Sequence, residues 1–171
     1  GPPRRRLGSR SGAGPSGREA AMRTNPPQYS PGQLIGERYR VLHACESGCL
    51  GTVHVCAEVG SATVVAVKVF RHELSRDADC AALLLHQAEA ARSLAARHPG
   101  LLAVHGCERT AAGELCLVME YIKGRTLRDV IRTEGPLDVG RAVRLAGQIA
   151  DALDAGHRQG IVHGHLCPEQ I

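Results

Sequence analysis

The chain has 171 residues, enough for one ordinary domain, and its 43% hydrophobic and 22% charged residues exclude a fibrous or wholly disordered protein. The net charge of +4 comes largely from an arginine-rich first part, and the near balance of the rest argues against a dedicated nucleic-acid surface. No stretch approaches the roughly 18 apolar residues of a membrane span, and seven cysteines without a C-x-x-C pair favour reduced thiols and a cytoplasmic location.

Residues 1–32 are rich in glycine, proline, serine and arginine and lack a hydrophobic period. This composition predicts a disordered, solvated arm; contact with nucleic acid or an acidic partner is the alternative. The chain begins with glycine, and Met22 is the only methionine nearby, so the origin of residues 1–21 stays open.

Runs of β-branched and apolar residues predict five strands after this arm. Short turns separate the first three, which indicates an antiparallel meander, and the polar residues 110–113 separate the last two. The predicted strands are residues 39–45, 52–59, 63–70, 101–106 and 114–121.

Helical periodicity predicts one helix within this series and two after it. The first covers residues 76–97, with its apolar face on Leu84, Ala88, Ala91 and Leu94/Ala95, and ends at His98-Pro99-Gly100. A short helix is expected at 126–133. A longer one begins after the N-cap Asp138 and is closed by Gly156 or Gly160. Its apolar stripe is Ala142, Leu145, Ile149 and Leu153.

Two features point to an anionic ligand. Lys68 lies in the apolar run 63–70, where an ammonium group costs free energy unless it has an anionic partner; an edge lysine that reaches water is the alternative. Gly48 and Gly51 lie between the first two predicted strands, and glycines let backbone N–H groups approach phosphate oxygens. Glu46 adds a carboxylate that would repel phosphates, and the two glycines could instead serve only a tight turn.

Four motifs follow one another along residues 33–171. They are Glu46-Ser47-Gly48-Cys49-Leu50-Gly51-Thr52-Val53, Val65-Ala66-Val67-Lys68, Leu117-Val118-Met119-Glu120-Tyr121 and His163-Gly164-His165-Leu166-Cys167-Pro168-Glu169-Gln170. In this order they resemble the glycine-rich loop, the V-A-I-K strand, the hinge and the H-R-D-L-K-P-E-N loop of eukaryotic-like bacterial serine/threonine protein kinases. The resemblance implies an α+β, protein kinase-like fold. Residues 33–121 would form a five-stranded antiparallel small lobe with one inserted helix, and residues 122–171 the hinge and first helices of the large lobe.

The resemblance also implies an ATP site. Lys68 would pair with Glu89 and meet the phosphates. Val53 and Ala66 would enclose the adenine, with Met119 behind it. The Glu120 carbonyl and the Ile122 N–H would bind its edge. The implied cofactor-binding residues are Gly48, Gly51, Val53, Ala66, Lys68, Glu89, Met119, Glu120 and Ile122.

In the catalytic-loop motif, the chemical groups differ from those of the family. His165 stands where the family has the aspartate base, Cys167 where it has a lysine, and Gln170 where it has a magnesium-binding asparagine. A histidine is not anionic, a cysteine supplies no positive charge, and Gln170 displaces its carbonyl by one methylene, so we expect poor Mg²⁺ binding. Because such charge contacts carry phosphoryl transfer, the sequence predicts negligible kinase activity.

Three functions remain open. The first is a pseudokinase that binds ATP weakly and regulates a protein partner. The second is a serine/threonine kinase that uses His165 as base on protein hydroxyls. The third is an interaction module without nucleotide. A zinc site at His163, His165 and Cys167 is a weaker alternative, because their spacing is not that of zinc motifs. The chain stops before any D-F-G segment, so we expect the apolar stripe of the last long helix to be left partly uncovered.

Overall fold

The computed structural model describes residues 29–48 and 50–171, apart from the side chain of Glu46. The predicted disorder of residues 1–28 and the role of Cys49 lie outside this part of the chain.

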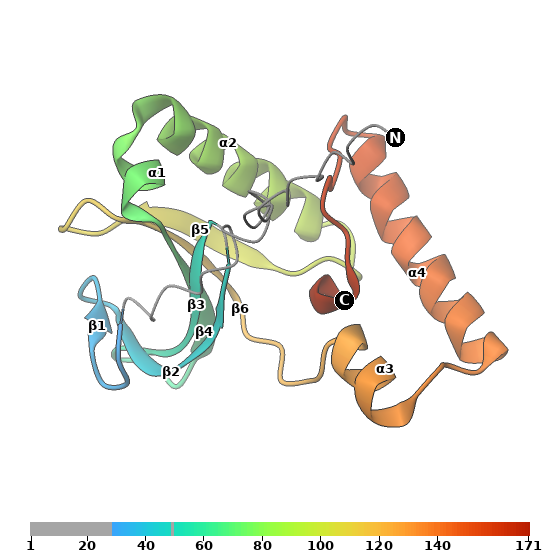
Figure 1. The fold of residues 1–171 in the computed structure, drawn as a ribbon. Helices are drawn as coiled ribbons and strands as arrows, with labels where there is room; N and C mark the ends of the chain where they lie inside the picture. The colour runs from blue at the N-terminus through green and yellow to red at the C-terminus, as the bar shows by residue number, and fades with distance from the viewer. Residues whose placement is uncertain (1–28, 49) are drawn as a thin grey trace, which may run out of the picture.

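The described residues form an antiparallel sheet with two helices against it, followed by two helices that lie beside this layer (Figure 1). The sheet has six strands in the order β1-β2-β3-β4-β6-β5. The strands are β1 (Leu34–Ile35), β2 (Tyr39–Ser47), β3 (Gly51–Glu58), β4 (Val64–Phe70), β5 (Val104–Arg109) and β6 (Leu115–Glu120). The helices are α1 (His72–Arg76), α2 (Ala78–Ala95), α3 (Leu127–Glu134), α4 (Val139–His157) and the short 3-10 helix η2 (Pro168–Gln170).

The prediction of five strands was wrong by one. The additional strand, β1, has two residues and pairs antiparallel with β2. Two residues are too few to show a periodic pattern, so the sequence carried no signal for it. The predicted arm also extends too far, because the Tyr29 hydroxyl donates a hydrogen bond to Glu114, the residue before β6. The segment from Tyr29 to β1 therefore packs on the sheet.

Strand β4 lies at the centre of the sheet, between β3 and β6. Val65, Val67 and Val69 are at most 4% exposed and belong to one apolar cluster with residues of β1, β2, β3 and β6. Ala66, Lys68 and Phe70 alternate with them and therefore point to the other face. On that second face, Phe70 packs with Ala81 of α2 and Leu115 of β6.

His54 of β3 is paired with Val67 of β4 and therefore lies on the same face of the sheet as the three valines. Its side chain is 0% exposed, and neither ring nitrogen has a hydrogen-bond partner within the described residues. The Tyr29 ring meets it edge-on, with 5.9 Å between the ring centroids. Burial lowers the pKa of His54, since a charged imidazolium here would have no partner.

The thiols of Cys56 and Cys116 are buried in the same layer, and burial raises the pKa of each to about 12. Among the described residues, Cys56, Cys80, Cys107, Cys116 and Cys167 form no disulfide. Because buried thiols with raised pKa values are poor nucleophiles, Cys56 and Cys116 act as core residues.

The predicted helix over 76–97 is present as α2, from Ala78 to Ala95, whereas the short helix α1 that precedes it was not predicted. Asp77 has an extended backbone (φ −70°, ψ 119°), and its side chain accepts a hydrogen bond from the Cys80 N–H. Asp77 therefore ends α1 and caps α2. The fourth predicted strand is also displaced, from 101–106 to Val104–Arg109, because residues after Pro99 first form a turn closed by the Leu101 N–H on the His98 carbonyl.

The two later helices begin where the sequence predicted, within one residue. Thr126 caps α3 through the Asp129 N–H, and Asp138 caps α4 through the Arg141 N–H. Gly160, at φ 72°, follows the end of α4, whereas Gly156 lies within the helix and is buried. Of the two predicted stops, Gly160 is the one at the helix end.

Gly51 is required by close packing between β3 and β4. A Cβ at this position would lie 2.1 Å from the Val69 carbonyl oxygen, whereas one at Gly48 would meet nothing closer than 3.9 Å. We expect Gly51→Ala to lower the free energy of unfolding by about 2 kcal/mol, since backbone must move to admit the methyl group. Urea unfolding measures this, with Gly48→Ala as the matched control that stays near the unaltered chain. Equal stability of the two variants would contradict the close packing.

His54 should make the protein less stable in mild acid. Its folded-state pKa lies below the ordinary value of 6.5, so the unfolded chain takes up the proton first as the pH falls below about 6.5. The free energy of unfolding then decreases by at most about 1.4 kcal/mol per pH unit, until the pH reaches the folded-state pKa. Unfolding measured from pH 7.5 to 5 should lose this slope in His54→Phe and keep it in His105→Gln, which changes an exposed histidine. A slope unchanged in His54→Phe would exclude this histidine as its source.

Candidate nucleotide site

The second face of the sheet carries four of the residues that the sequence assigned to a nucleotide. Val53 of β3 pairs with Lys68 of β4, and Lys68 pairs with Leu117 of β6. Two residues along the strand from Lys68, Ala66 is paired with Met119. Directly opposite side chains in an antiparallel pair share a face, so Val53, Ala66, Lys68 and Met119 point to the same side.

Lys68 is half-buried on this face, and its Nζ lies 5.8 Å from the centroid of the Phe70 ring. None of the ion pairs within the described residues includes Lys68. A cation–π contact offsets only part of the free energy needed to desolvate an ammonium group. An anionic ligand would therefore find an unneutralised cation on this face.

The expected pair between Lys68 and Glu89 is not formed in the structure. The Glu89 carboxylate instead binds Arg92 of the same helix, with 2.8 Å between Arg92 Nη2 and Glu89 Oε1. Hydrogen bonds from Arg92 lower the pKa of Glu89. The reason lies in the helix geometry, because Ala88 faces the core and the next residue points about 100° away from it. Arg92, three residues on, is the nearest partner on that side.

The turn between β2 and β3 contains the two glycines of the proposed phosphate cradle. The Gly48 N–H donates to the Gly51 carbonyl at 2.8 Å, so this amide serves the turn itself. The Leu50 N–H, by contrast, makes no hydrogen bond within the described residues. Space for a Cβ at Gly48 shows that the protein does not need glycine there for packing. Glu46 has its backbone in β2, opposite Val53, but its side chain lies outside the described part of the structure.

The connection from β6 to α3 contains Glu120 and Ile122, the residues that the sequence analysis assigned to the edge of an adenine. Glu120 ends β6, and its side chain accepts a hydrogen bond from the Ala103 N–H at 2.7 Å. Tyr121 and Ile122 are exposed, and the Ile122 N–H has no hydrogen-bond partner within the described residues. An extended segment with a free N–H can bind the edge of a flat ring.

The catalytic-loop residues lie on the segment between α4 and the last residue. His165 is exposed, and its N–H donates to His163 Nδ1 at 3.3 Å. Gly164, between them, has φ 71°, a conformation that favours glycine. Cys167 precedes η2, and Gln170 ends it. Within the described residues no cluster of three or more His, Cys, Asp and Glu side chains is arranged to hold a metal ion.

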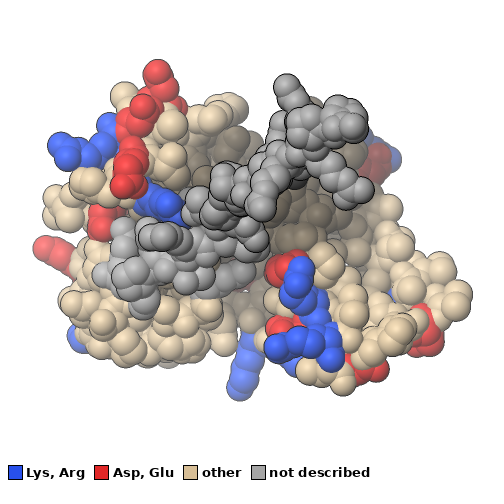
Figure 2. Space-filling model, viewed as in Figure 1, with Lys and Arg blue, Asp and Glu red and all other residues tan. Residues whose placement is uncertain are grey.

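This segment is tied to α3. The Leu127 N–H donates to the Ile171 carbonyl at 2.7 Å, and Arg128 forms an ion pair with Glu169. Figure 2 shows the basic side chains over α3 beside acidic ones, in keeping with the further ion pairs of Arg125 with Glu134 and of Arg132 with Asp129. These arginines are therefore neutralised within the protein.

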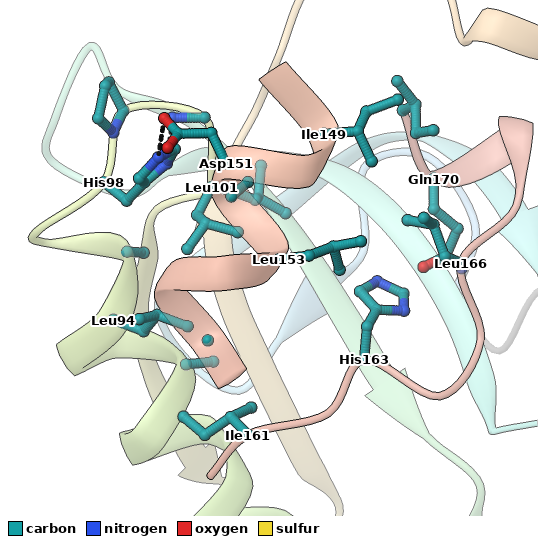
Figure 3. A pocket seen from close by; sticks show the side chains of 18 of the residues that line it. Leu94, His98, Leu101, Ile149, Asp151, Leu153, Ile161, His163, Leu166 and Gln170 are labelled. Carbon is teal, nitrogen blue, oxygen red and sulfur yellow. Dashed lines mark hydrogen bonds and ion pairs between the residues drawn. The ribbon is translucent and has the colours of Figure 1, made fainter. Parts of the chain in front are cut away.

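A pocket of about 1000 Å³ lies between α2, β5, β6, α4 and the catalytic-loop segment. Figure 3 shows Leu153 of α4, and His163 and Gln170 of the loop, directed into it. Leu145 and Ile149 also line it and stay partly exposed, so the predicted incomplete covering of the α4 stripe is confirmed.

One contact at the rim of this pocket was not anticipated. The Gly100 N–H donates to His98 Nδ1 at 3.1 Å. Because Nδ1 accepts this hydrogen bond, Nε2 carries the ring proton and donates it to the Asp151 carboxylate of α4, also at 3.1 Å. His98 thereby links the loop after α2 to α4. The two residues are 53 positions apart, and no local pattern connects them.

The structure describes no helix that is both long and apolar enough to cross a membrane.

Comparison with known proteins identifies the fold. The family model described as "Protein kinase domain" matches residues 39–171. The chain is 34% identical over 150 residues to the serine/threonine-protein kinase pkn3 of Myxococcus xanthus, and 36% identical over 140 residues to PknB of Mycobacterium tuberculosis. These alignments cover 88% and 80% of this chain but only 27% and 22% of the relatives.

A solved structure gives the same result for the fold. The PknI kinase domain of Mycobacterium tuberculosis superposes with a TM-score of 0.69 at 24% identity, over 82% of this chain and 56% of that one. The chain thus spans about a quarter of its curated relatives and just over half of a kinase domain. The fold, the order of the motifs and the family match agree: the chain belongs to the protein kinase family, among the eukaryotic-like serine/threonine kinases of bacteria.

Proposed function

We propose that this chain is a pseudokinase module that binds ATP weakly on the Lys68 face and acts by regulating a protein partner. The observation that carries the proposal is the half-buried Lys68 ammonium, which has no carboxylate partner within the described residues. Triphosphate oxygens would supply the missing negative charge. The apolar side chains of Val53 and Ala66 on the same face suit an adenine ring.

The proposed affinity is weak for two reasons. Glu89 is bound to Arg92, so it does not hold Lys68 in position for a phosphate. Glu46 introduces a negative charge in the strand that leads into the glycine turn. Lys68, Gly48, Gly51 and the 120–122 segment are assigned to the nucleotide on this proposal, and Glu89 is not.

We also propose that the chain does not transfer phosphate, because the side chains of its catalytic loop lack the necessary charges. An exposed His165 offers no fixed anion to orient a hydroxyl group, and Cys167 brings no positive charge to a transferring phosphoryl group. Gln170 is directed into the apolar pocket, which is an unfavourable place for a magnesium ligand. Each missing charge contact in such a site commonly lowers the rate by about 100-fold.

An active kinase is the second candidate, because the curated relatives carry the name serine/threonine-protein kinase. On that hypothesis His165 would accept the proton of a serine or threonine hydroxyl, and ATP with Mg²⁺ would bind as in the family. Protein substrates and a cytoplasmic location belong to either hypothesis as proposals.

ATP should stabilise the chain through Lys68. At a ligand concentration ten times the dissociation constant, the gain in unfolding free energy is about 1.4 kcal/mol, which a thermal-shift measurement detects. We expect the shift at millimolar ATP to disappear in Lys68→Met and to persist in Lys123→Met, which removes an exposed lysine. If the unaltered chain shows no shift, the nucleotide-binding proposal fails and the interaction module without nucleotide takes its place.

Phosphate transfer should be absent. We expect the chain, incubated with γ-labelled ATP, Mg²⁺ and casein, to transfer no more label than Lys68→Met does, since the loop lacks the charges that stabilise the moving phosphoryl group. Transfer above that background, and its loss in His165→Ala, would establish the active kinase instead.

A further inference from the structure

Arg71 follows β4 directly and makes contact with the glycine turn by two separate groups. Its backbone N–H donates to the Leu50 carbonyl at 2.9 Å, and its guanidinium Nη2 donates to the Gly48 carbonyl at 3.3 Å. The turn between β2 and β3 is thus held at both of its described carbonyls by one residue.

Arg71 is itself fixed from the other side. Its carbonyl accepts hydrogen bonds from the Ser75 N–H at 3.1 Å and from the Ser75 hydroxyl at 3.2 Å. Ser75 is 1% exposed, and its hydroxyl oxygen accepts the Leu115 N–H of β6 at 3.0 Å. The Ser75 carbonyl is bound by Arg109 of β5 at 2.8 Å. The backbone of Arg71 is therefore anchored to β6 and β5, on the opposite side of β4 from the glycine turn.

Carbonyl oxygens that face an anion repel it, whereas backbone N–H groups attract it. Because the Arg71 guanidinium donates to the Gly48 carbonyl, the negative end of that carbonyl is bound to a cation and repels a nearby anion less. The guanidinium also brings a positive charge to the turn, next to the strand in which Glu46 adds a negative one. Arg71 is only partly exposed, so solvent screens this charge less than that of a free surface arginine.

We infer that Arg71 is the positioning residue of the phosphate-binding turn: it keeps the Gly48 and Leu50 carbonyls in hydrogen bonds, so that they do not face a bound nucleoside polyphosphate, and it does not touch the adenosine part. The inference rests on the proposed ATP binding and adds a residue that no family motif assigns. If the inference is right, substitution of Arg71 lowers the affinity for a nucleotide more strongly the more phosphate groups the nucleotide has.

Calorimetric titration with adenosine, ADP and ATP separates these contributions. We expect Arg71→Met to weaken ATP binding by about fivefold, the loss of one charge-assisted hydrogen bond at a partly exposed site, to weaken ADP less, and to leave adenosine unchanged. Arg71→Lys keeps a cationic donor and should recover part of the ATP affinity. Arg76→Met is the matched control, since it removes an exposed arginine five positions on in α1 and should leave all three affinities unchanged.

The outcomes decide between the possibilities. If Arg71→Met binds ATP as the unaltered chain does, or loses adenosine and ATP equally, Arg71 does not position the turn and the inference is wrong. Thermal unfolding of each variant without ligand identifies a general loss of structure, which would also lower adenosine binding. If the unaltered chain binds none of the three ligands, the proposed function fails and the inference fails with it.

Discussion

Pairing of β4 with β3 on one side and β6 on the other is the constraint on which the structure depends. It places Val65, Val67 and Val69 in the core at 4% exposure or less, which by necessity turns the alternate residues to the opposite face. A shift of register by one residue would bury Lys68 among the valines and expose a buried valine in its place. The position of the ammonium group is therefore a consequence of burying the apolar face.

Helix α2, which packs on the Lys68 face of the sheet, is positioned by different contacts. Asp77 caps α2 and Ser75 anchors the preceding turn to β6, so the first turn of α2 has a defined place on the sheet. Further along, Ala88 and Leu94 face inward while Glu89 is turned toward Arg92. Exposed leucines at positions 83 and 85 show that apolar residues lie on more than one side of α2. A helix with apolar residues on several sides does not have one rotation strongly preferred over its neighbours.

The segment formed by α3, α4 and the catalytic loop resembles a kinase in its backbone arrangement more than in its catalytic side chains. The loop after α4 is held by α3 through Leu127 and Arg128, and its His163 is directed into the pocket between the layers. Glu169 has one carboxylate oxygen on Arg128, while the other is buried without a partner within the described residues. The frame of the loop is thus kept by contacts of Leu127 and Arg128 that do not depend on the side chains of His165 or Gln170.

The sequence by itself determined the central strands, the start of α3 and α4 and the family, because each depends on residues close together in the chain. A run of β-branched residues predicted β4, and an Asp or Thr side chain at an N-cap acts on an amide three residues away. The short strand β1, the break at Asp77 and the partner of Glu89 were not predicted. Only the tertiary structure decided these, together with the Arg71 and His98 contacts, because a hydrogen bond between distant segments leaves no periodic pattern and the rotation of α2 follows from the packing of the whole sheet.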